Sequence, residues 1–359
     1  MTHLPMKNLS IATIALGVLL IVIKPAGAQP SSLPSQFTYS HGIAPRMQWN
    51  ENSGYCGETS FISAGMHFGQ YCSQFTAREI ASPGINQADP ASQLLVGVND
   101  TYAARKMRLQ AAEFYSAAQS NVRDFLRWTK SNTLAGNVVV MGVFNNGILL
   151  EEWTCRTDGD SEFDHIVPVL GWGSNASLED YSSDYIAGDV ITISDNGLYG
   201  PFGAPPEYQF LYSYHLRKFT GNRVQANNPN GPVYLLKNQP QSYAIAIGGV
   251  LDLDEVTLPV RLTSDKNYEP EIGVGSNLPP PPIPITLTAT VTISNQSAAH
   301  VLYRYDNFDK VPVAGFNAAA ANAVESWEIP PNSGPAFVVE LQTLSNATAV
   351  FRAVPADAP

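Results

Sequence analysis

The order of two hydrophobic periodicities constrains the fold of this chain most strongly. Apolar side chains recur at helical spacing in the stretches 58–70, 102–115 and 122–132, and this periodicity almost disappears beyond residue 238. Short β-branched runs with strand character begin at residue 138. The clearest of these runs are 138–144, 166–170 and 189–193. Helices followed by antiparallel strands indicate an α+β fold.

The region beyond residue 238 has the pattern of an all-β domain. Threonines alternate with apolar residues from Thr286 to Ile293, which predicts a strand with one buried face. The proline-rich segment 279–284 is predicted to be a loop within this region rather than an interdomain linker. Further strand candidates are 256–262 and 336–341. We therefore expect a mixed first domain over residues 29–238 and a β-sandwich over residues 242–355.

The first 28 residues have the pattern of a secretory signal peptide. Lys7 precedes an apolar run from Leu9 to Ile23, and Ala26-Gly27-Ala28 matches a small-residue cleavage site. That run is too short for a membrane-spanning helix, and no later segment has the required length. The sequence therefore predicts a secreted, extracellular protein without a membrane span.

The charge balance excludes one class of partner. The chain has 20 Lys and Arg against 31 Asp and Glu, a net charge of −11. Such an acidic protein is repelled by nucleic acid and by anionic membrane surfaces, so neither is expected as a partner. The sequence predicts no particular oligomeric state. Asn-x-Ser/Thr sequons, which predict surface loops and candidate glycosylation sites, occur at Asn99, Asn175, Asn295 and Asn346.

The most informative single residue is Cys56. It follows the loop-like sequence Asn52-Ser53-Gly54-Tyr55 and directly precedes an apolar pattern of helical spacing. A thiol at a helix N-terminus lies beside unpaired N–H groups and the positive end of the macrodipole, which favour the thiolate. Because the thiolate is the nucleophilic form of cysteine, Cys56 is a candidate nucleophile. The alternative is a buried or disulfide-bonded structural cysteine.

A candidate base and a candidate orienting residue follow Cys56 along the chain. His165 stands at the start of the predicted strand 166–170, and Asp195 and Asn196 close the strand near residue 193. A carboxylate or amide at that strand end can accept the imidazole N–H, so that the other ring nitrogen faces the thiol. We favour Asp195 in this role, with Asn196 as the alternative.

The number of cysteines gives Cys56 a reason to be unpaired. Cys56, Cys72 and Cys155 are the three cysteines, and three cannot all pair within one chain. In an oxidising compartment a Cys72–Cys155 disulfide would leave Cys56 free. An intermolecular disulfide through any of the three remains an alternative.

The motifs around Cys56, His165 and Asp195 resemble those of the papain-like superfamily of cysteine peptidases. In residues 45 to 203 of this chain, a Cys on a predicted helix is followed by a His and then an Asp or Asn on predicted strands, which is similar to the order in that superfamily. The run Tyr-Cys-Gly-Glu-Thr-Ser and the aspartate resemble the bacteriocin-processing branch more than papain. The resemblance implies a papain-like fold, with Cys56 as nucleophile, His165 as base and Asp195 as orienting residue.

The resemblance also implies an amide that stabilises the oxyanion several residues before the nucleophile. Asn50 occupies the usual position, and Gln48 lies two residues further upstream, so both are candidates. The implied function is that of a secreted cysteine peptidase, or a related thiol acyl hydrolase, acting on peptide or amide bonds of a peptide or protein substrate. The same residues also serve acyl transfer. The alternative is an inactive papain-like scaffold that binds a peptide or glycan.

No metal or cofactor is expected. Asp158, Asp160, Glu162 and Asp164 offer oxygen ligands that suit calcium, but they do not match an EF-hand loop. We interpret them as a solvated acidic loop. The sequence contains no phosphate-binding glycine loop and no zinc-binding pattern.

Overall fold

The computed structural model describes residues 36–43, 46–114, 122–143, 163, 165–178, 189–194, 196, 209–214, 221–225 and 242–358, without the side chains of 122–123, 209–214 and 221–225. Several predictions fall outside this part of the chain. They concern the signal peptide, Cys155, Asp195 and the acidic residues Asp158, Asp160, Glu162 and Asp164.

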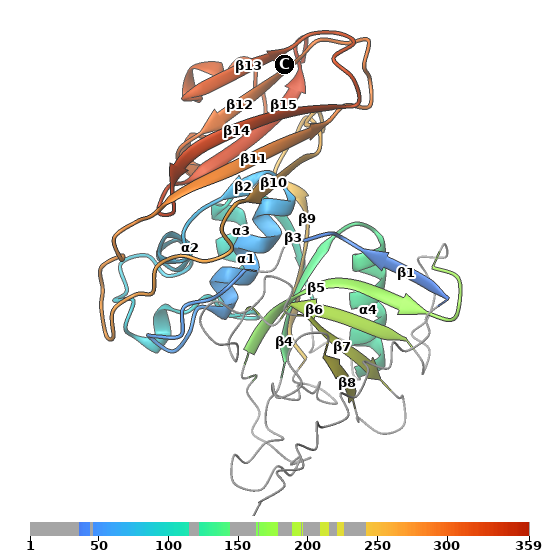
Figure 1. The fold of residues 1–359 in the computed structure, drawn as a ribbon, viewed down its shortest axis with the longest axis vertical. Coiled ribbons are helices and arrows are strands. Elements are labelled where there is room, and N and C mark those ends of the chain that lie inside the picture. The colour runs from blue at the N-terminus through green and yellow to red at the C-terminus, as the bar shows by residue number, and fades with distance from the viewer. Residues whose placement is uncertain are drawn as a thin grey trace, which may run out of the picture. The chain divides into compact units, whose positions relative to one another are not determined.

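The described residues contain both helices and antiparallel sheets, which confirms the predicted α+β class (Figure 1). The helices are α1 (Cys56–His67), α2 (Gln74–Ala81), α3 (Asp100–Lys106) and α4 (Val122–Leu134), with short 3₁₀ helices at Pro90–Ser92, Phe308–Lys310 and Ala320–Asn322. The first strands are β1 (Phe37–Ser40), β2 (Gln70–Tyr71), β3 (Leu109–Glu113), β4 (Val138–Val143), β5 (His165–Ser174), β6 (Val190–Ser194), β7 (Gln209–Tyr214) and β8 (Gly221–Gln225). The later strands are β9 (Ala244–Val250), β10 (Val260–Ser264), β11 (Pro284–Thr292), β12 (His300–Tyr305), β13 (Glu325–Ile329), β14 (Ala336–Leu344) and β15 (Ala349–Pro355). None of these helices is both long enough and apolar enough to cross a membrane.

The largest sheet in the described part of the chain has the order β3-β9-β4-β5-β6-β7-β8, with β1 paired to the second half of β5. Alternate residues of β4 face different helices. Val138 and Val140 belong to the cluster that includes α1, whereas Val139 and Met141 pack with Phe125 of α4. Helices α1 and α4 therefore cover opposite faces of this sheet.

Two smaller sheets contain most of the C-terminal strands. Their orders are β10-β11-β14 and β13-β12-β15-β2. Burial alternates along β11, with Leu287, Ala289 and Val291 buried, as the threonine pattern predicted. All of the proline-rich segment except Pro284, the first residue of β11, lies between β10 and β11, and these strands pair with each other. It therefore connects two paired strands of the β region.

The structure corrects the predicted domain boundary. Strand β9, expected in a β-sandwich over residues 242–355, instead lies between β3 and β4 in the large sheet. Conversely, β2 follows α1 directly and pairs with β15 in a C-terminal sheet. Residues 32–359 accordingly form one compact unit. Strand pairing joins distant segments, so a boundary drawn from local periodicity alone was wrong here.

Two helical assignments also change. The pattern over 102–115 predicted a single helix, but α3 ends at Lys106 and the chain continues as strand β3. Arg108 between them has a left-handed φ of 58°, which terminates a helix. Helix α2 was not predicted, although Ser73 is an N-cap whose side chain accepts a hydrogen bond from the N–H of Thr76.

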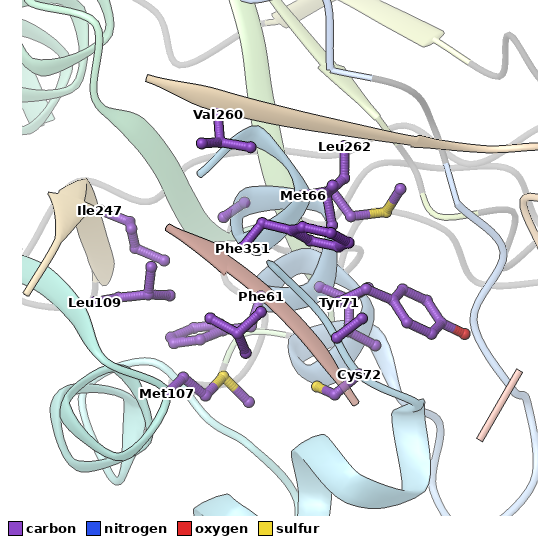
Figure 2. Packing of buried hydrophobic residues seen from close by; sticks show 14 of the residues in the cluster. Phe61, Met66, Tyr71, Cys72, Met107, Leu109, Ile247, Val260, Leu262 and Phe351 are labelled. Carbon is purple, nitrogen blue, oxygen red and sulfur yellow. The ribbon is translucent and has the colours of Figure 1, made fainter. Parts of the chain in front are cut away.

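The C-terminal strands support the helix that begins at Cys56. Phe61 and Met66 of α1 belong to one buried cluster with Val260, Leu262 and Phe351 of β10 and β15 (Figure 2). At the other end of α1, Arg261 donates to the carbonyl of His67, and Arg352 donates to that of Phe68 at 3.3 Å. Cations at a helix C-terminus satisfy its free carbonyls and complement its dipole. The position of α1 therefore depends on residues nearly 300 positions away along the chain.

The buried Glu269 gives the stability a defined pH dependence. It accepts hydrogen bonds from the N–H of Gln74 at 3.1 and 3.2 Å, and burial raises its pKa from 4.5 to about 8. Between these values the folded protein binds more protons than the unfolded chain, so the free energy of unfolding should fall as the pH rises. We expect Glu269→Gln to remove this fall in urea unfolding measured from pH 5 to 9. The exposed control Glu340→Gln should retain it, and a wild-type slope in Glu269→Gln would contradict the assignment.

Candidate active site

Cys56 is the first residue of α1 and is half-buried, so the structure puts this thiol at a helix N-terminus. Gly57 lets the helix start approach a neighbouring loop, because a Cβ at this position would overlap the carbonyl oxygen of Leu94. Glycine is therefore required after Cys56 for steric reasons. It allows the loop around residue 94 to lie directly beside the thiol.

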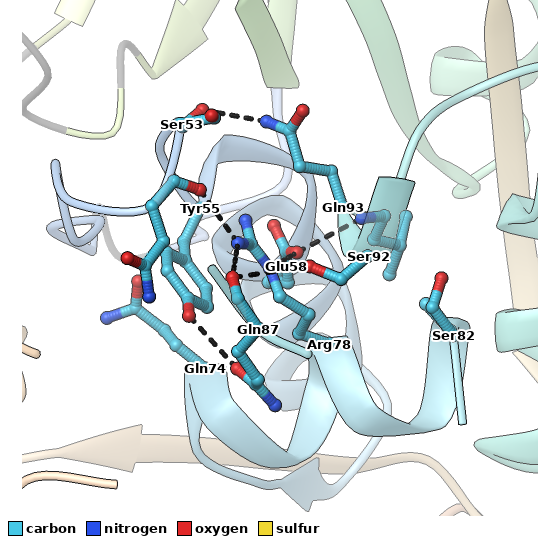
Figure 3. A network of polar contacts seen from close by, with 12 residues as sticks. Ser53, Tyr55, Glu58, Gln74, Arg78, Ser82, Gln87, Ser92 and Gln93 are labelled. Carbon is cyan, nitrogen blue, oxygen red and sulfur yellow. Dashed lines mark hydrogen bonds and ion pairs between the residues drawn. The ribbon is translucent and has the colours of Figure 1, made fainter. Parts of the chain in front are cut away.

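The loop before Cys56 is held by a buried ion pair (Figure 3). Arg78 Nε lies 2.6 Å from Glu58 Oε1, and both side chains are almost completely buried. The same arginine donates to the carbonyls of Asn52, at 2.9 Å, and Gly54. Its guanidinium also lies 3.4 Å from the centre of the Tyr55 ring. Arg78 therefore holds three of the four residues that lead into Cys56.

Glu58 connects this loop to the next one. Its Oε1 accepts a hydrogen bond from the N–H of Leu94 at 3.0 Å. A second link runs from Gln93 Nε2 to the carbonyl of Ser53 at 2.7 Å (Figure 3). The loops on either side of Cys56 are thus joined to each other as well as to α1.

A segment remote in sequence covers the outer side of the same loop. Glu271 Oε1 accepts hydrogen bonds from the N–H groups of Asn50 and Glu51, at 3.1 and 3.4 Å. Ile272 packs with the buried rings of Trp49 and Tyr55. Sequence analysis missed this role of residues 266–277, because a short segment with two glutamates, two glycines and one serine looks like a solvated loop.

His165 shares a cavity with Cys56. It is the first residue of β5, is 1% exposed, and lines a cavity of about 510 Å³ that Cys56 also lines. Two of the predicted catalytic residues, 109 positions apart in the sequence, thus meet at one site. The predicted orienting residue Asp195 lies outside the described residues.

Asn196 connects the elements that carry the candidate site. Its Nδ2 lies 3.2 Å from the carbonyl of Cys56, 3.0 Å from Ser60 Oγ and 2.9 Å from the carbonyl of Ile166. Its own carbonyl accepts the N–H of Gln48 at 2.9 Å. The amide nitrogen therefore bonds α1 to β5. The role of Asn196 as the alternative orienting residue stays a prediction, because the imidazole N–H would be accepted by Oδ1 and not by this nitrogen.

The fully buried Asn196 also has a left-handed φ of 62°, which allows a matched test. Glycine adopts this conformation without strain, so Asn196→Gly should remove the side-chain hydrogen bonds and leave the backbone unchanged. We expect a loss of about 1–3 kcal/mol in the free energy of unfolding, because buried carbonyls lose their donor. The exposed Asn332, with a φ of 63°, provides the control Asn332→Gly. Equal effects of the two substitutions in urea unfolding would contradict this role.

The two oxyanion candidates differ in burial. Gln48 is 5% exposed, and its Nε2 is the atom nearest to where a Cβ on Gly54 would lie, at 3.4 Å. The Gln48 Oε1 atom is buried without a hydrogen-bond partner within the described part of the chain. Asn50 is exposed and lies beside Glu271 instead. Gln48 is therefore the candidate whose amide is buried near Gly54, and Asn50 is the candidate that is exposed to solvent.

Cys72 does not form the predicted disulfide. It is a free thiol that is buried in the core beside Tyr71, and Cys155 lies outside the described residues. Burial raises the pKa of the Cys72 thiol well above its usual range. A thiol held in its neutral form is a poor nucleophile and metal ligand, so Cys72 is expected to be chemically inert.

The four sequons differ in accessibility. Asn175, Asn295 and Asn346 are exposed, as a glycosylation site requires. Asn99 is half-buried, and its Nδ2 donates to Ser82 Oγ and to the carbonyls of Gln93 and Ala81. A glycan on Asn99 would break these bonds, so the structure argues against modification there.

No group of three or more His, Cys, Asp or Glu side chains suited to a metal ion is present within the described ranges. A scan against protein-family models and searches of curated proteins and of solved structures find no match to this chain.

Proposed function

We propose that the chain is a cysteine peptidase or a related thiol acyl hydrolase, in which Cys56 is the nucleophile and His165 the base. The observation that supports this most strongly is the cavity lined by both residues, with Cys56 at the N-terminus of α1. Peptide and amide bonds of a peptide or protein are the proposed substrates. The helices α1 and α4 on either face of the large sheet fit a papain-like arrangement, to which the C-terminal sheets would add a β-sandwich.

In the proposed first half-reaction, the thiol proton of Cys56 passes to His165, and the thiolate attacks the acyl carbon. The carbonyl π electrons move onto oxygen, and the N–H of Cys56 and the amide of Gln48 donate to this oxyanion. Collapse of the tetrahedral intermediate breaks the C–N bond. The leaving amine takes the proton from His165, and the acyl group remains on Cys56 as a thioester.

In the second half-reaction, water attacks the thioester while His165 accepts one of its protons. The C–S bond breaks, the carboxylic acid leaves, and the proton returns to the Cys56 sulfur. An amine in place of water would complete acyl transfer by the same steps. Asp195 is proposed to hold the imidazole in the orientation that both halves require.

The proposed location is outside the cell, after removal of residues 1–28. The exposed residues Asn175, Asn295 and Asn346 remain the proposed positions for glycans.

The oxyanion role can be separated from general loop stability by a matched pair of substitutions. Gln48→Leu should lower kcat by about 10²–10³, the usual cost of one oxyanion donor, with little change in KM. Asn50→Leu removes an exposed amide from the same loop and should leave kcat within about threefold of wild type. Steady-state kinetics on one peptide substrate would measure both. The reverse order of effects would assign the donor role to Asn50.

The proposed activity is tested by incubating the purified protein with a proteome-derived peptide mixture and identifying new termini by mass spectrometry. Cleavage by the wild type and none by Cys56→Ala is the expected result. Incorporation of ¹⁸O from labelled water into the new carboxylates would identify hydrolysis, whereas products joined to an added amine would identify acyl transfer. Binding of intact peptides without any Cys56-dependent product would instead support the inactive-scaffold alternative.

A further inference from the structure

Apart from Cys56 and His165, the cavity that these two residues share has a largely apolar lining. Its apolar lining consists of Leu95, Val96, Val98, Phe163 and Tyr243. No Asp, Glu, Lys or Arg side chain is among the described residues that line it. A volume of about 510 Å³ is within the range of cavities that bind small ligands or single bulky side chains.

One wall of the cavity is aromatic. The rings of Phe163 and Tyr243 pack edge to face, with centroids 5.6 Å apart. Two glycines make room for them, because a Cβ at Gly142 would lie 2.8 Å from the Phe163 ring and one at Gly97 2.7 Å from the Tyr243 ring. The close backbone approach fixes both rings at the edge of the site.

The loop that carries Gly97 also lines the cavity, and its own hydrogen bonds hold it in place. Asp100 Oδ2 accepts the N–H of Gly97 at 3.0 Å, and Asn99 Oδ1 accepts that of Leu95 at 2.8 Å. Val98 on this loop is 72% exposed although it is apolar. An exposed apolar side chain on a rigid loop beside a reactive thiol is suited to contact with a ligand.

We infer that this cavity selects acyl substrates that present a bulky, uncharged and apolar side chain beside the scissile bond. This inference rests on the proposed function of Cys56 and His165. An apolar side chain would be removed from water against Phe163, Tyr243 and Val98. A charged side chain would lose its hydration and find no opposite charge among the lining residues that the structure describes.

The test uses electrophilic peptides, because their reaction with Cys56 needs no knowledge of the natural substrate. Acetyl-X-Gly and acetyl-Gly-X chloromethyl ketones, with X as Leu, Phe, Asp or Lys, cover two substrate positions. The thiolate displaces chloride and forms a thioether, which intact-mass spectrometry and peptide mapping quantify at Cys56. Iodoacetamide, which has no such side chain, measures the intrinsic reactivity of the thiol.

At one or both positions, we expect the Leu and Phe probes to react about 10- to 200-fold faster than the Asp and Lys probes, after division by the iodoacetamide rate. Equal rates at both positions, with iodoacetamide still reacting at Cys56 in a His165-dependent manner, would overturn this inference and leave the proposed function standing. No reaction of Cys56 even with iodoacetamide would overturn both.

A charge placed on the exposed loop gives a second, independent result. Val98→Glu should slow the Leu probe and accelerate the Lys probe, reversing their order or bringing their rates within about threefold. The matched control Val338→Glu adds the same charge at an exposed position of β14 and should leave both rates unchanged. Identical probe selectivity in Val98→Glu and wild type would contradict the assignment of this cavity.

Discussion

His165→Ala should lower kcat/KM for a cleavable peptide by about 10²–10⁴, the contribution that a positioned general acid and base usually makes. The imidazole is proposed to act in both half-reactions, so no other described residue of the cavity replaces it. The side chain is 1% exposed, and its removal leaves space next to the cavity. Imidazole added to the solution should therefore restore part of the activity.

Rescue by imidazole separates a catalytic role from a structural one. A substitution that merely disturbed β5 would lower the activity without rescue and would also lower the midpoint of urea unfolding. Activity of His165→Ala within threefold of wild type would contradict the assignment of His165 as base.

Arg78→Ala is expected to lower the free energy of unfolding by about 3–5 kcal/mol, the cost of removing one partner of a buried ion pair. Glu58 would remain as an uncompensated buried charge, and the carbonyls of Asn52, Gln87 and Gly54 would lose their donor. Because this arginine also fixes the loop before Cys56, the activity should fall even at temperatures where the variant is folded.

A surface ion pair provides the control for this effect. Arg304 and Glu325 lie 2.6 Å apart, with Glu325 47% exposed, and Arg304→Ala should cost about 0–1 kcal/mol. The double substitution Arg78→Met with Glu58→Gln should recover part of the loss from Arg78→Ala, because no buried charge remains. If urea unfolding gave the same small loss for Arg78→Ala and Arg304→Ala, the buried pair would not have its proposed structural role.

Local patterns predicted the elements that surround the site. The apolar spacing after residue 58 predicted α1 to within a few residues, and the alternation of threonines predicted the buried face of β11. Both signals arise from side chains that face one core, so they are visible in a single stretch of sequence. The order of the motifs predicted that Cys56 and His165 act together; both line one cavity, and their roles as nucleophile and base stay predictions.

Non-local pairing was not predictable in the same way. The run Ala244–Val250 is as apolar as any buried strand, and nothing in it specifies that its neighbours are β3 and β4. Similarly, Glu269 and Glu271 look like solvated charges, yet the first is buried and accepts the N–H of Gln74, and the second accepts the N–H of Asn50. Such roles depend on contacts more than 190 residues apart, which a periodicity analysis does not detect.

The choice between Gln48 and Asn50 shows how structure refines a motif. Their spacing from Cys56 left both amides as candidates. Burial now separates them, because the hydrogen bond from Gln48 N–H to Asn196 directs the chain inward at this point, while Asn50 faces solvent beside Glu271.

The central proposal is that His165 activates Cys56 as a nucleophile, and its most direct test is the rate of Cys56 carboxamidomethylation by iodoacetamide at pH 7. Peptide mapping at successive times would follow Cys56 and Cys72 separately in wild type and in His165→Ala. We expect Cys56 of the wild type to react at least about tenfold faster than Cys56 of His165→Ala, with Cys72 unreactive in both. Equal Cys56 rates in the two proteins would contradict the proposal.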